Sequence, residues 1–393
     1  MAFISCAGFS IEAGLTEFDL QEAQIKSHML RSAKRVVALV DSSKLGQESL
    51  APFASLEQVS HLITDQKIEP HLVERLRQSN LTLVICGENT VSSFSPVDTE
   101  RTHYKIGFAN LSEQIPFAVD VRRSLERAAK EAGNIDLVVA DNQLNGEVAL
   151  RIAENLIAKG VDLVIEYQIN EKVGNIIMNR FQQAGIPVIA VDIPMVGANF
   201  FGADNYRSGH MAGTALGQWI QKWWDGHFDR LIVLEEPRAG ALPAARIQGQ
   251  LDGLQEVVGE IPQARLIFLD SGNTSEISAA HMFETLKAHP DEHKLAVISF
   301  NDDAAIGALL AARQAKREHE VVIVGQGADR LVRPEIRRPT PRIIGSTAFM
   351  PERYGEKLVQ MTLKILRGEA VPPATYIDHT LITPQNIELF YPE

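Results

Sequence analysis

The chain alternates short apolar segments with longer amphipathic ones. The apolar segments are rich in Val, Ile and Leu without polar alternation, as expected for parallel strands buried on both faces. They lie at 35–40, 81–86, 105–109, 135–140, 162–165, 187–191, 231–234, 265–269, 295–300 and 321–325. Between them, segments such as 116–132, 146–159, 171–184 and 208–223 have a helical period and end at Gly or another turn signal. This strict alternation predicts an α/β fold with parallel sheets and right-handed crossovers.

The periodic pattern stops once, between Gly87 and His103, where Gly, Asn, Ser, Pro, Asp and Thr predominate. We interpret residues 91–103 as a linker. It separates a front domain at residues 1–90 from a back domain at residues 104–393. The back domain is long enough for two doubly wound lobes.

Composition narrows the class of protein. The chain has 393 residues, enough for two or three domains, and a formal net charge of -12. This charge has the wrong sign for a protein whose main partner is a nucleic-acid backbone, and we find no separate basic module. The arginines at 330, 333, 337, 338 and 342 alternate with Pro and Glu, so we interpret them as a solvated edge.

Targeting and metal-binding signals are missing from the sequence. No apolar run approaches the roughly 20 residues that span a bilayer, and the first 25 residues contain no Lys or Arg. The two cysteines, Cys6 and Cys86, have neither disulfide-framework nor metal-ligand spacing. We therefore expect a cytoplasmic protein without a membrane contact.

We also expect no catalysis, cofactor or metal. The sequence has no GxxxxGK[ST], HExxH or GxSxG motif, and its 11 His residues are scattered. The segment Gly325-Gln-Gly-Ala-Asp-Arg330 begins like a dinucleotide fingerprint but lacks the third Gly and the strand-to-helix context.

Polar residues follow several predicted strands, where ligands bind in doubly wound sheets. Asn110, Asp141, Asp192 and Asn301 hold such positions. Each of them also fits a simpler role, such as capping a turn or a helix. Several fixed donors and acceptors beside an apolar surface are typical of a site for a small polyol.

An ordered set of motifs in the back domain carries a family resemblance. It consists of Ile-Pro-Val-Ile-Ala-Val-Asp192, Asp204-Asn-Tyr-Arg-Ser-Gly, Ala-Ala-Arg246, Asn301-Asp302 and Pro351-Glu-Arg-Tyr-Gly-Glu. In this order they resemble class I periplasmic binding proteins of the ribose-binding type and the effector domains of lactose-repressor-type regulators. The resemblance covers about 104–393 and implies a two-lobed fold that binds a sugar without turning it over.

The resemblance also implies roles for single residues. Asn110 and Phe117 are expected to line the first-lobe loop, with Phe117 stacking on a sugar ring. Asp192 is expected to accept from sugar hydroxyls, and Arg246 and Asn301 to reach in from the second lobe.

Three positions depart from the ribose-binding pattern. Ile193 replaces an expected Arg, Gly327 beside Gln326 replaces an Asp, and Phe349 replaces a Gln. Gln326 and Phe349 are themselves expected to contact the ligand. Because unpaired buried hydroxyls cost about 1 to 3 kcal/mol each, a ligand less polar than ribose, or of another shape, is expected.

The front domain carries a second resemblance. Gly8-Phe-Ser-Ile-Glu-Ala-Gly14-Leu-Thr16, Asp41-Ser-Ser-Lys44-Leu-Gly46 and Leu62-Ile-Thr-Asp65 resemble the carboxyl half of a DeoR-type regulator's effector domain. That family senses phosphorylated sugars, which makes Lys26 and Lys44 candidate phosphate contacts, although both also fit as solvated lysines. Its helix-turn-helix and Gly-rich phosphate loop have no counterpart in this sequence.

Together the two resemblances lead to one hypothesis. The chain is expected to be a sugar-sensing transcriptional regulator, or its effector portion, acting as a homodimer that reaches DNA only through a module missing from this chain. The alternative is the solute-binding protein of a sugar transporter.

Overall fold

The computed structural model describes residues 1–87, 90–94 and 103–392. The chain divides into two compact units, Met1–Thr102 with Gln360–Pro373 and His103–Val359 with Ala374–Glu393. Within the described residues, no helix is long and apolar enough to cross a membrane.

The first unit contains a five-stranded sheet in the order β1-β4-β6-β7-β8. Strands β1, β4, β6 and β7 are parallel, and β8 is antiparallel to β7. The strand bounds are β1 (Ala2–Ile4), β4 (Val36–Leu39), β6 (His61–Asp65), β7 (Thr82–Cys86) and β8 (Val91–Phe94). The prediction of a linker from residue 91 is therefore wrong for residues 91–94, and residues 95–102 of it lie outside the described residues.

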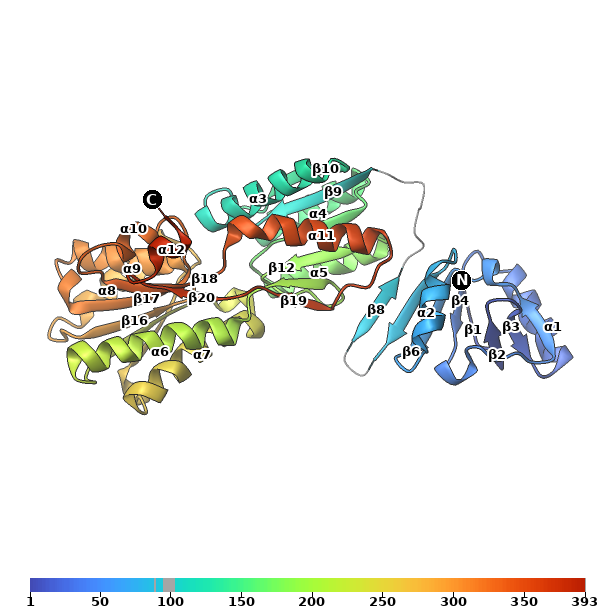
Figure 1. Cartoon of the computed structure of the whole chain (residues 1–393), viewed down its shortest axis with the longest axis horizontal. Coiled ribbons are helices and arrows are strands. Elements are labelled where there is room, and N and C mark those ends of the chain that lie inside the picture. The colour runs from blue at the N-terminus through green and yellow to red at the C-terminus, as the bar shows by residue number, and fades with distance from the viewer. Residues whose placement is uncertain (88–89, 95–102, 393) are drawn as a thin grey trace. The chain divides into compact units, whose positions relative to one another are not determined.

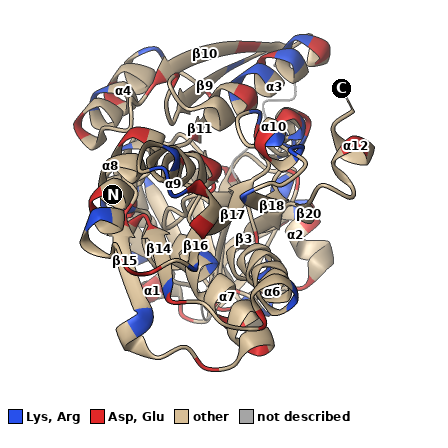
Figure 2. Ribbon diagram, turned by 90° about the vertical axis from the view of Figure 1, so that its left-hand side faces the viewer, with Lys and Arg blue, Asp and Glu red and all other residues tan. Residues whose placement is uncertain are grey.

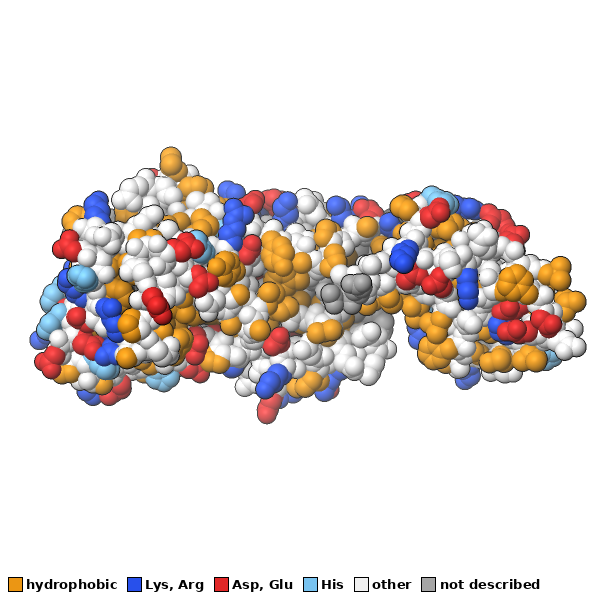
Figure 3. All heavy atoms as spheres, turned by 90° about the horizontal axis from the view of Figure 1, so that it is seen from below, with side chains coloured by type: hydrophobic (Ala, Val, Ile, Leu, Met, Phe, Trp, Pro, Cys, Tyr) orange, Lys and Arg blue, Asp and Glu red, His pale blue; other side chains and the backbone are white. Residues whose placement is uncertain are grey.

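A small antiparallel sheet and two helices complete this unit. The sheet contains β2 (Gly8–Ser10), β3 (Gly14–Glu17) and β5 (Ala51–Ala54). Helix α1 (Leu20–Arg31) begins at Asp19, whose carboxylate accepts from the backbone N–H groups of Gln21 and Glu22, and α2 is Pro70–Arg77. Phe9, Leu15, Leu62 and Leu83 form part of its core. Large apolar side chains also reach its surface, including Phe3 and Phe18, and Figure 3 shows hydrophobic side chains among charged ones there.

The second unit has two lobes, each built on a six-stranded sheet. The first sheet has the order β10-β9-β11-β12-β13-β19 and is parallel throughout. Its strands are β9 (Tyr104–Asn110), β10 (Ile135–Asp141), β11 (Leu163–Glu166), β12 (Val188–Val191), β13 (Asn199–Gly202) and β19 (Ala374–Tyr376). Figure 1 shows this sheet with helices α3 (Pro116–Ala132), α4 (Gly146–Ala158), α5 (Glu171–Gln183) and α11 (Tyr354–Leu366).

The second sheet has the order β15-β14-β16-β17-β18-β20, and β20 is its antiparallel member. Its strands are β14 (Arg230–Glu235), β15 (Leu266–Asp270), β16 (Leu295–Ser299), β17 (Val321–Gly327), β18 (Ile343–Ala348) and β20 (Thr380–Ile382). Its helices are α6 (Asn205–Trp224), α7 (Ala241–Val258), α8 (Ser275–Ala288), α9 (Asp302–Gln314), α10 (Arg333–Ile336) and α12 (Ile387–Phe390). The continuous apolar strands predicted from the sequence thus form two sheets, one parallel throughout and one parallel except for β20. This confirms the two-lobed α/β fold.

The chain passes between the lobes after β13, after β18 and after β19. At the first crossing Asp204 donates its backbone N–H to Nε2 of His379, which lies on the third crossing, at 3.0 Å. The crossing segments are therefore joined to each other by a hydrogen bond.

Glycines bring α6 and α7 close together. A Cβ on Gly209 would lie 2.0 Å from the carbonyl oxygen of Arg246, and one on Gly249 would lie 2.2 Å from that of Tyr206. Figure 1 shows the two helices side by side along the second lobe. This close approach holds the backbone of Arg246 beside the start of α6.

The arginine-rich segment between β17 and β18 is paired with carboxylates. Arg330 donates to Asp120 at 2.8 Å, and Arg338 pairs with Glu335 at 2.7 Å. Figure 2 shows basic residues, in blue, and acidic residues, in red, next to each other along the ribbon around α10. This pairing agrees with the interpretation of these arginines as a solvated edge.

Candidate functional site

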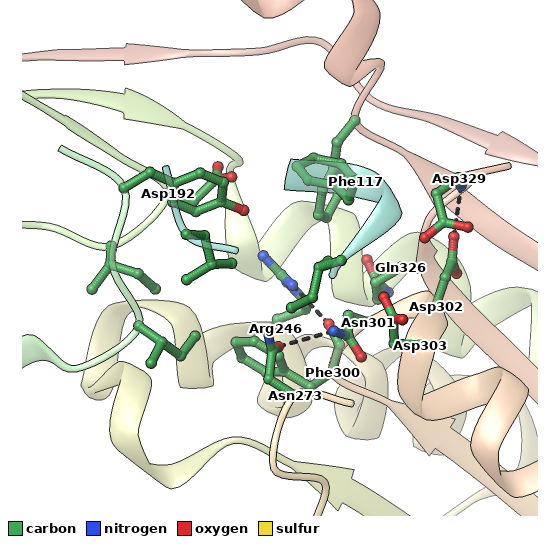
Figure 4. A pocket seen from close by; sticks show the side chains of 16 residues that line it. Phe117, Asp192, Arg246, Asn273, Phe300, Asn301, Asp302, Asp303, Gln326 and Asp329 are labelled. Atoms are coloured by element: carbon green, nitrogen blue, oxygen red, sulfur yellow. Dashed lines mark hydrogen bonds between the residues drawn. The ribbon is translucent and has the colours of Figure 1, made fainter. Parts of the chain in front are cut away.

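A cavity within the second unit is lined by residues from both lobes. Its lining residues are Leu111, Ile115, Phe117, Tyr167, Ile169, Asp192, Ile193, Arg246, Asn273, Phe300, Asn301, Asp302, Asp303, Gln326, Asp329 and Phe349. Figure 4 shows Asp192 on one side and Asp302, Asp303 and Asp329 on the other.

Six of the residues predicted from the sequence line this cavity: Phe117, Asp192, Arg246, Asn301, Gln326 and Phe349. Asn110 and Asp141 end the paired strands β9 and β10 but are not among the lining residues. Asn110 instead donates to Glu113 at 2.8 Å and accepts from the N–H of Leu111, and Asp141 accepts from the N–H of Gln143. Both side chains stabilise local turns.

Arg246 is buried, and its guanidinium is held by fixed acceptors. Its Nε and Nη2 donate to Oδ1 of Asn205 at 3.1 and 2.8 Å, and its Nη1 donates to the carbonyl oxygen of Phe300 at 2.7 Å. The rings of Phe300 and Phe349 lie 4.6 and 4.8 Å from its central carbon. Burial lowers the pKa of Arg246, and the charge of Asp192 opposes that shift.

Asp192 follows β12 in an unusual backbone conformation. Its φ is +58°, in the left-handed region that few non-glycine residues adopt. Burial raises the pKa of its carboxyl group to about 6, against the opposing charge of Arg246. The hydroxyl of Tyr354 donates to Asp192 Oδ1 at 3.3 Å. The sequence therefore directs this carboxylate into the cavity at the cost of local strain.

Aromatic rings form an apolar part of the wall. Phe117 lies edge-to-face against Phe349, with ring centroids 6.1 Å apart, and against Tyr354, with centroids 5.8 Å apart. Such edge contacts leave ring surface available to an apolar face of a ligand.

The second lobe contributes a polar wall from the start of α9. Asn301 caps this helix by accepting from the N–H of Ala304, and its Nδ2 donates to Oδ1 of Asn273 at 2.9 Å. Asp302 accepts from the hydroxyl of Ser346 at 2.6 Å and from the N–H of Asp329 at 2.8 Å. Burial, and then the charge of Asp329, raises the pKa of Asp302 well above its ordinary value.

Several lining residues were not predicted from the sequence. Asp303 lies two positions after the predicted residue Asn301, and Asp329 lies two positions after Gly327, where the resemblance had predicted an Asp. The Asp329 carboxylate accepts from the N–H groups of Leu331 and Val332. The prediction considered only the single position of Gly327. A search for carboxylates along the whole turn after β17 would have found Asp329.

A second buried carboxyl group, Glu166, ends β11 next to the lining residue Tyr167. Its Oε1 accepts from Nδ2 of Asn142 at 2.8 Å, whereas its Oε2 has no hydrogen-bond partner within the part of the chain that the structure describes. Burial raises the pKa of Glu166 to about 8, and the hydrogen bond from Asn142 opposes that shift.

The candidate phosphate contacts lie in the first unit. Lys26, on α1, forms ion pairs with Glu17 and with Glu22, whose carboxylate is 2.8 Å away. Lys44 ends the 3-10 turn Ser42–Lys44 and forms no ion pair with a described carboxylate. The two lysines therefore differ, because only Lys44 keeps its charge available to an anion.

Comparison with known proteins identifies the class of each unit. A model described as a periplasmic binding protein domain matches residues 106–370, more than half of the chain, and one described as a DeoR C terminal sensor domain matches residues 1–66. The chain therefore belongs to the periplasmic binding protein family and carries a DeoR-type sensor segment in front. Both predicted resemblances are confirmed.

Individual relatives agree with this assignment. The ribose import binding protein RbsB of Escherichia coli is 27% identical over 275 residues, covering 69% of this chain and 87% of the relative. The HTH-type transcriptional regulator GolR of Listeria innocua is 34% identical over 85 residues, covering 22% of this chain. The chain spans about a third of the length of that regulator, namely 34%.

Solved structures share the two-lobed fold. A transporter solute binding protein from Agrobacterium vitis with bound allitol has a TM-score of 0.65 at 20% identity, covering 74% of this chain and 98% of its own. One from Bacillus halodurans with bound myo-inositol has a TM-score of 0.64 at 20% identity, covering 74% and 99%. The sugar-binding fold is thus shared by proteins whose polyol ligands differ in shape.

Proposed function

We propose that this chain is the effector portion of a sugar-responsive transcriptional regulator. In this proposal the second unit binds a small carbohydrate between its lobes without converting it, in the cytoplasm, and the protein acts as a homodimer. The first domain would extend through β8, which ends at Phe94, and the second would comprise residues 104–393. The observation that carries the proposal is the presence of a DeoR-type sensor segment and a sugar-binding domain in one chain.

The cavity supports the carbohydrate part of the proposal. It combines an apolar wall containing Phe117 with hydrogen-bonding groups on Asp192, Arg246 and Asn301. This mixture suits a polyol, whose hydroxyl groups need fixed partners and whose C–H face needs an apolar surface. Hydrogen bonds and apolar contacts of this kind need no covalent bond to form or break, so binding alone accounts for the arrangement.

A thermal-unfolding titration tests carbohydrate binding. The full chain is measured with pentoses, hexoses, sugar alcohols, inositols and their phosphates, and a ligand present at about 100 times its Kd adds about 2.7 kcal/mol to the free energy of unfolding. Asp192→Ala is expected to weaken binding by about 1 to 3 kcal/mol. Asp141→Ala is the matched control, because its carboxylate ends a strand outside the cavity. Unchanged unfolding with every compound would contradict the proposal.

A solute-binding role in sugar transport is the second candidate, supported by the match over 87% of RbsB. The DNA upstream of the Met1 codon separates the two. In-frame coding sequence for a helix-turn-helix supports the regulator, whereas an in-frame signal peptide supports transport and contradicts a cytoplasmic sensor.

A further inference from the structure

The residues that line the cavity carry an excess of acidic groups. They include four carboxyl groups, on Asp192, Asp302, Asp303 and Asp329, and a single guanidinium group, on Arg246. Figure 4 shows three of these carboxyl groups close together at one side, with Gln326 beside them. A ligand that fills this space therefore meets an electrostatic field of mostly one sign.

The donors of the wall are largely engaged with protein groups. All three guanidinium nitrogens of Arg246 already donate to Asn205 or to Phe300, as described above. The amide nitrogen of Asn301 donates to Asn273. These bonds use three of the five N–H groups of the Arg246 guanidinium, so the donors left for a ligand are fewer than the carboxylate oxygens of the cavity.

Two acceptors, in contrast, have few protein donors. Gln326 is only 2% exposed, and its Oε1 has no hydrogen-bond partner among the residues that the structure describes. Asp303 is 6% exposed, and its carboxylate accepts from its own backbone N–H. Asp302 and Asp329 accept from more distant groups, namely the hydroxyl of Ser346 and the backbone N–H groups of residues 329, 331 and 332.

The environment of Asp303 makes an unpaired negative charge unfavourable. Burial, and then the charge of Asp329, raises its pKa from the ordinary 3.8 to about 7. The nearby ionisable groups also include Asp302 and Tyr167. A cation brought next to Asp303 would stabilise the ionised carboxylate, which a neutral hydroxyl group does only weakly.

We propose that the ligand of this cavity is a sugar or sugar alcohol that carries a protonated amine, and that Asp303 and the amide oxygen of Gln326 bind the ammonium group. This inference rests on the proposed carbohydrate-binding function. An ammonium group only donates hydrogen bonds, so it suits the free amide oxygen of Gln326 and the carboxylate of Asp303, whose remaining acceptor positions it can fill.

Other ligand chemistries fit less well. A phosphate or carboxylate would be placed among four carboxyl groups, with Arg246 as the one Lys or Arg among the lining residues and three of its five N–H groups already donated to Asn205 and Phe300. For a metal ion, no group of three or more His, Cys, Asp or Glu within the described residues is placed to hold one. A neutral polyol would bind the aromatic wall but leave Asp303 without a counter-charge.

Calorimetric titration of the full chain at pH 7 with matched sugar pairs tests the inference. The pairs are glucosamine with glucose, galactosamine with galactose, and mannosamine with mannose, and N-acetylglucosamine serves as a neutral compound with the same nitrogen position. We expect at least one amino sugar to bind tenfold or more tightly than both its parent and any N-acetyl form.

The variant Asp303→Asn identifies the contact. It is expected to weaken binding of the amino sugar at least tenfold more than binding of the parent sugar. Asp141→Asn, a strand-end carboxylate outside the cavity, is expected to change neither affinity. Urea unfolding of both variants establishes that they are folded.

The outcomes separate the two proposals. A parent sugar that binds as tightly as its amine overturns the ammonium assignment and leaves carbohydrate binding intact. Equal losses of both ligands in Asp303→Asn also overturn it, because the residue would then act on the shape of the site. A folded chain that binds no sugar of either kind contradicts the proposed function and this inference with it.

Discussion

The two lobes contribute different chemistry to the same cavity. The first lobe supplies mainly apolar side chains, with Asp192 as its carboxylate: Leu111, Ile115, Phe117, Tyr167, Ile169 and Ile193. The second lobe supplies the guanidinium, the amides and three carboxyl groups, together with Phe300 and Phe349. The contrast teaches that one lobe provides most of the apolar surface of the cavity and the other most of its polar groups, so we expect substitutions in the two lobes to have different effects.

The largest expected effect lies in the second lobe, at Arg246. Arg246→Ala removes the donors to Asn205 and to the carbonyl of Phe300 and leaves buried acceptors unpaired. We expect the free energy of unfolding to fall by about 4 kcal/mol, measured by urea denaturation, with loss of ligand binding. Arg207→Ala, an exposed position on α6, is the control. A stability equal to that of the parent chain would show that the polar wall is not held by this residue.

In the first lobe, the largest expected effect is on the pH dependence of stability. Glu166 has an ordinary pKa of 4.5 and a folded-state pKa of about 8, so between these values the folded state binds more protons than the unfolded chain. Stability therefore falls as the pH rises, by about 3 kcal/mol between pH 5 and pH 8.

The variant Glu166→Gln is expected to remove this contribution, as seen by urea unfolding at the two pH values. Glu147→Gln, exposed on α4, serves as the comparison and is expected to keep the pH dependence of the parent chain. If Glu166→Gln shows the same fall in stability, the titrating group lies elsewhere, for example among the carboxyl groups of the second lobe.

A smaller effect is expected from the apolar wall itself. Phe117→Ala removes a ring that contacts Phe349 and Tyr354, and we expect it to weaken binding of any sugar about tenfold, or roughly 1.4 kcal/mol. The loss should be the same for an amino sugar and its parent, because the ring contacts the C–H face. Phe268→Ala, on the outer strand β15, is the control, and a selective loss of the amino sugar would contradict this division of roles.

The smallest effect is expected outside both lobes. Lys44→Ala in the first unit is expected to change the affinity of the cavity ligand by less than about 0.3 kcal/mol, within the usual range for surface substitutions. Calorimetric titration checks this, and a sugar phosphate whose binding is lost in Lys44→Ala would reveal a separate anion site in the first unit.

The polar residues that line the cavity were easier to predict from the sequence than the apolar ones. Asn301 and Asp192 follow strands and are polar where a core residue would be apolar, so their positions stand out. Ile115 and Ile169 are indistinguishable from core residues in the sequence, because lining a cavity and filling a core require the same side chains. The prediction for Asn110 shows the opposite error, since a polar strand-end residue also serves the turn that follows it.

The fold was predictable for a related reason. A continuous apolar strand indicates that both of its faces are buried, and this pattern does not depend on the ligand. Both sheets could therefore be predicted from the sequence. Strand β8 was missed because the four residues Val91–Phe94 are too few to establish a period and follow a segment of turn-forming residues.

The three crossings between the lobes have a consequence for how a ligand is captured. Because the crossings are covalent and the first and third share the hydrogen bond between Asp204 and His379, each wall of the cavity stays at a high effective concentration relative to the other. A ligand that first contacts either wall then meets the second in an intramolecular step. The loss of translational entropy is incurred once, at the first contact, and the second lobe adds its interactions without incurring it again.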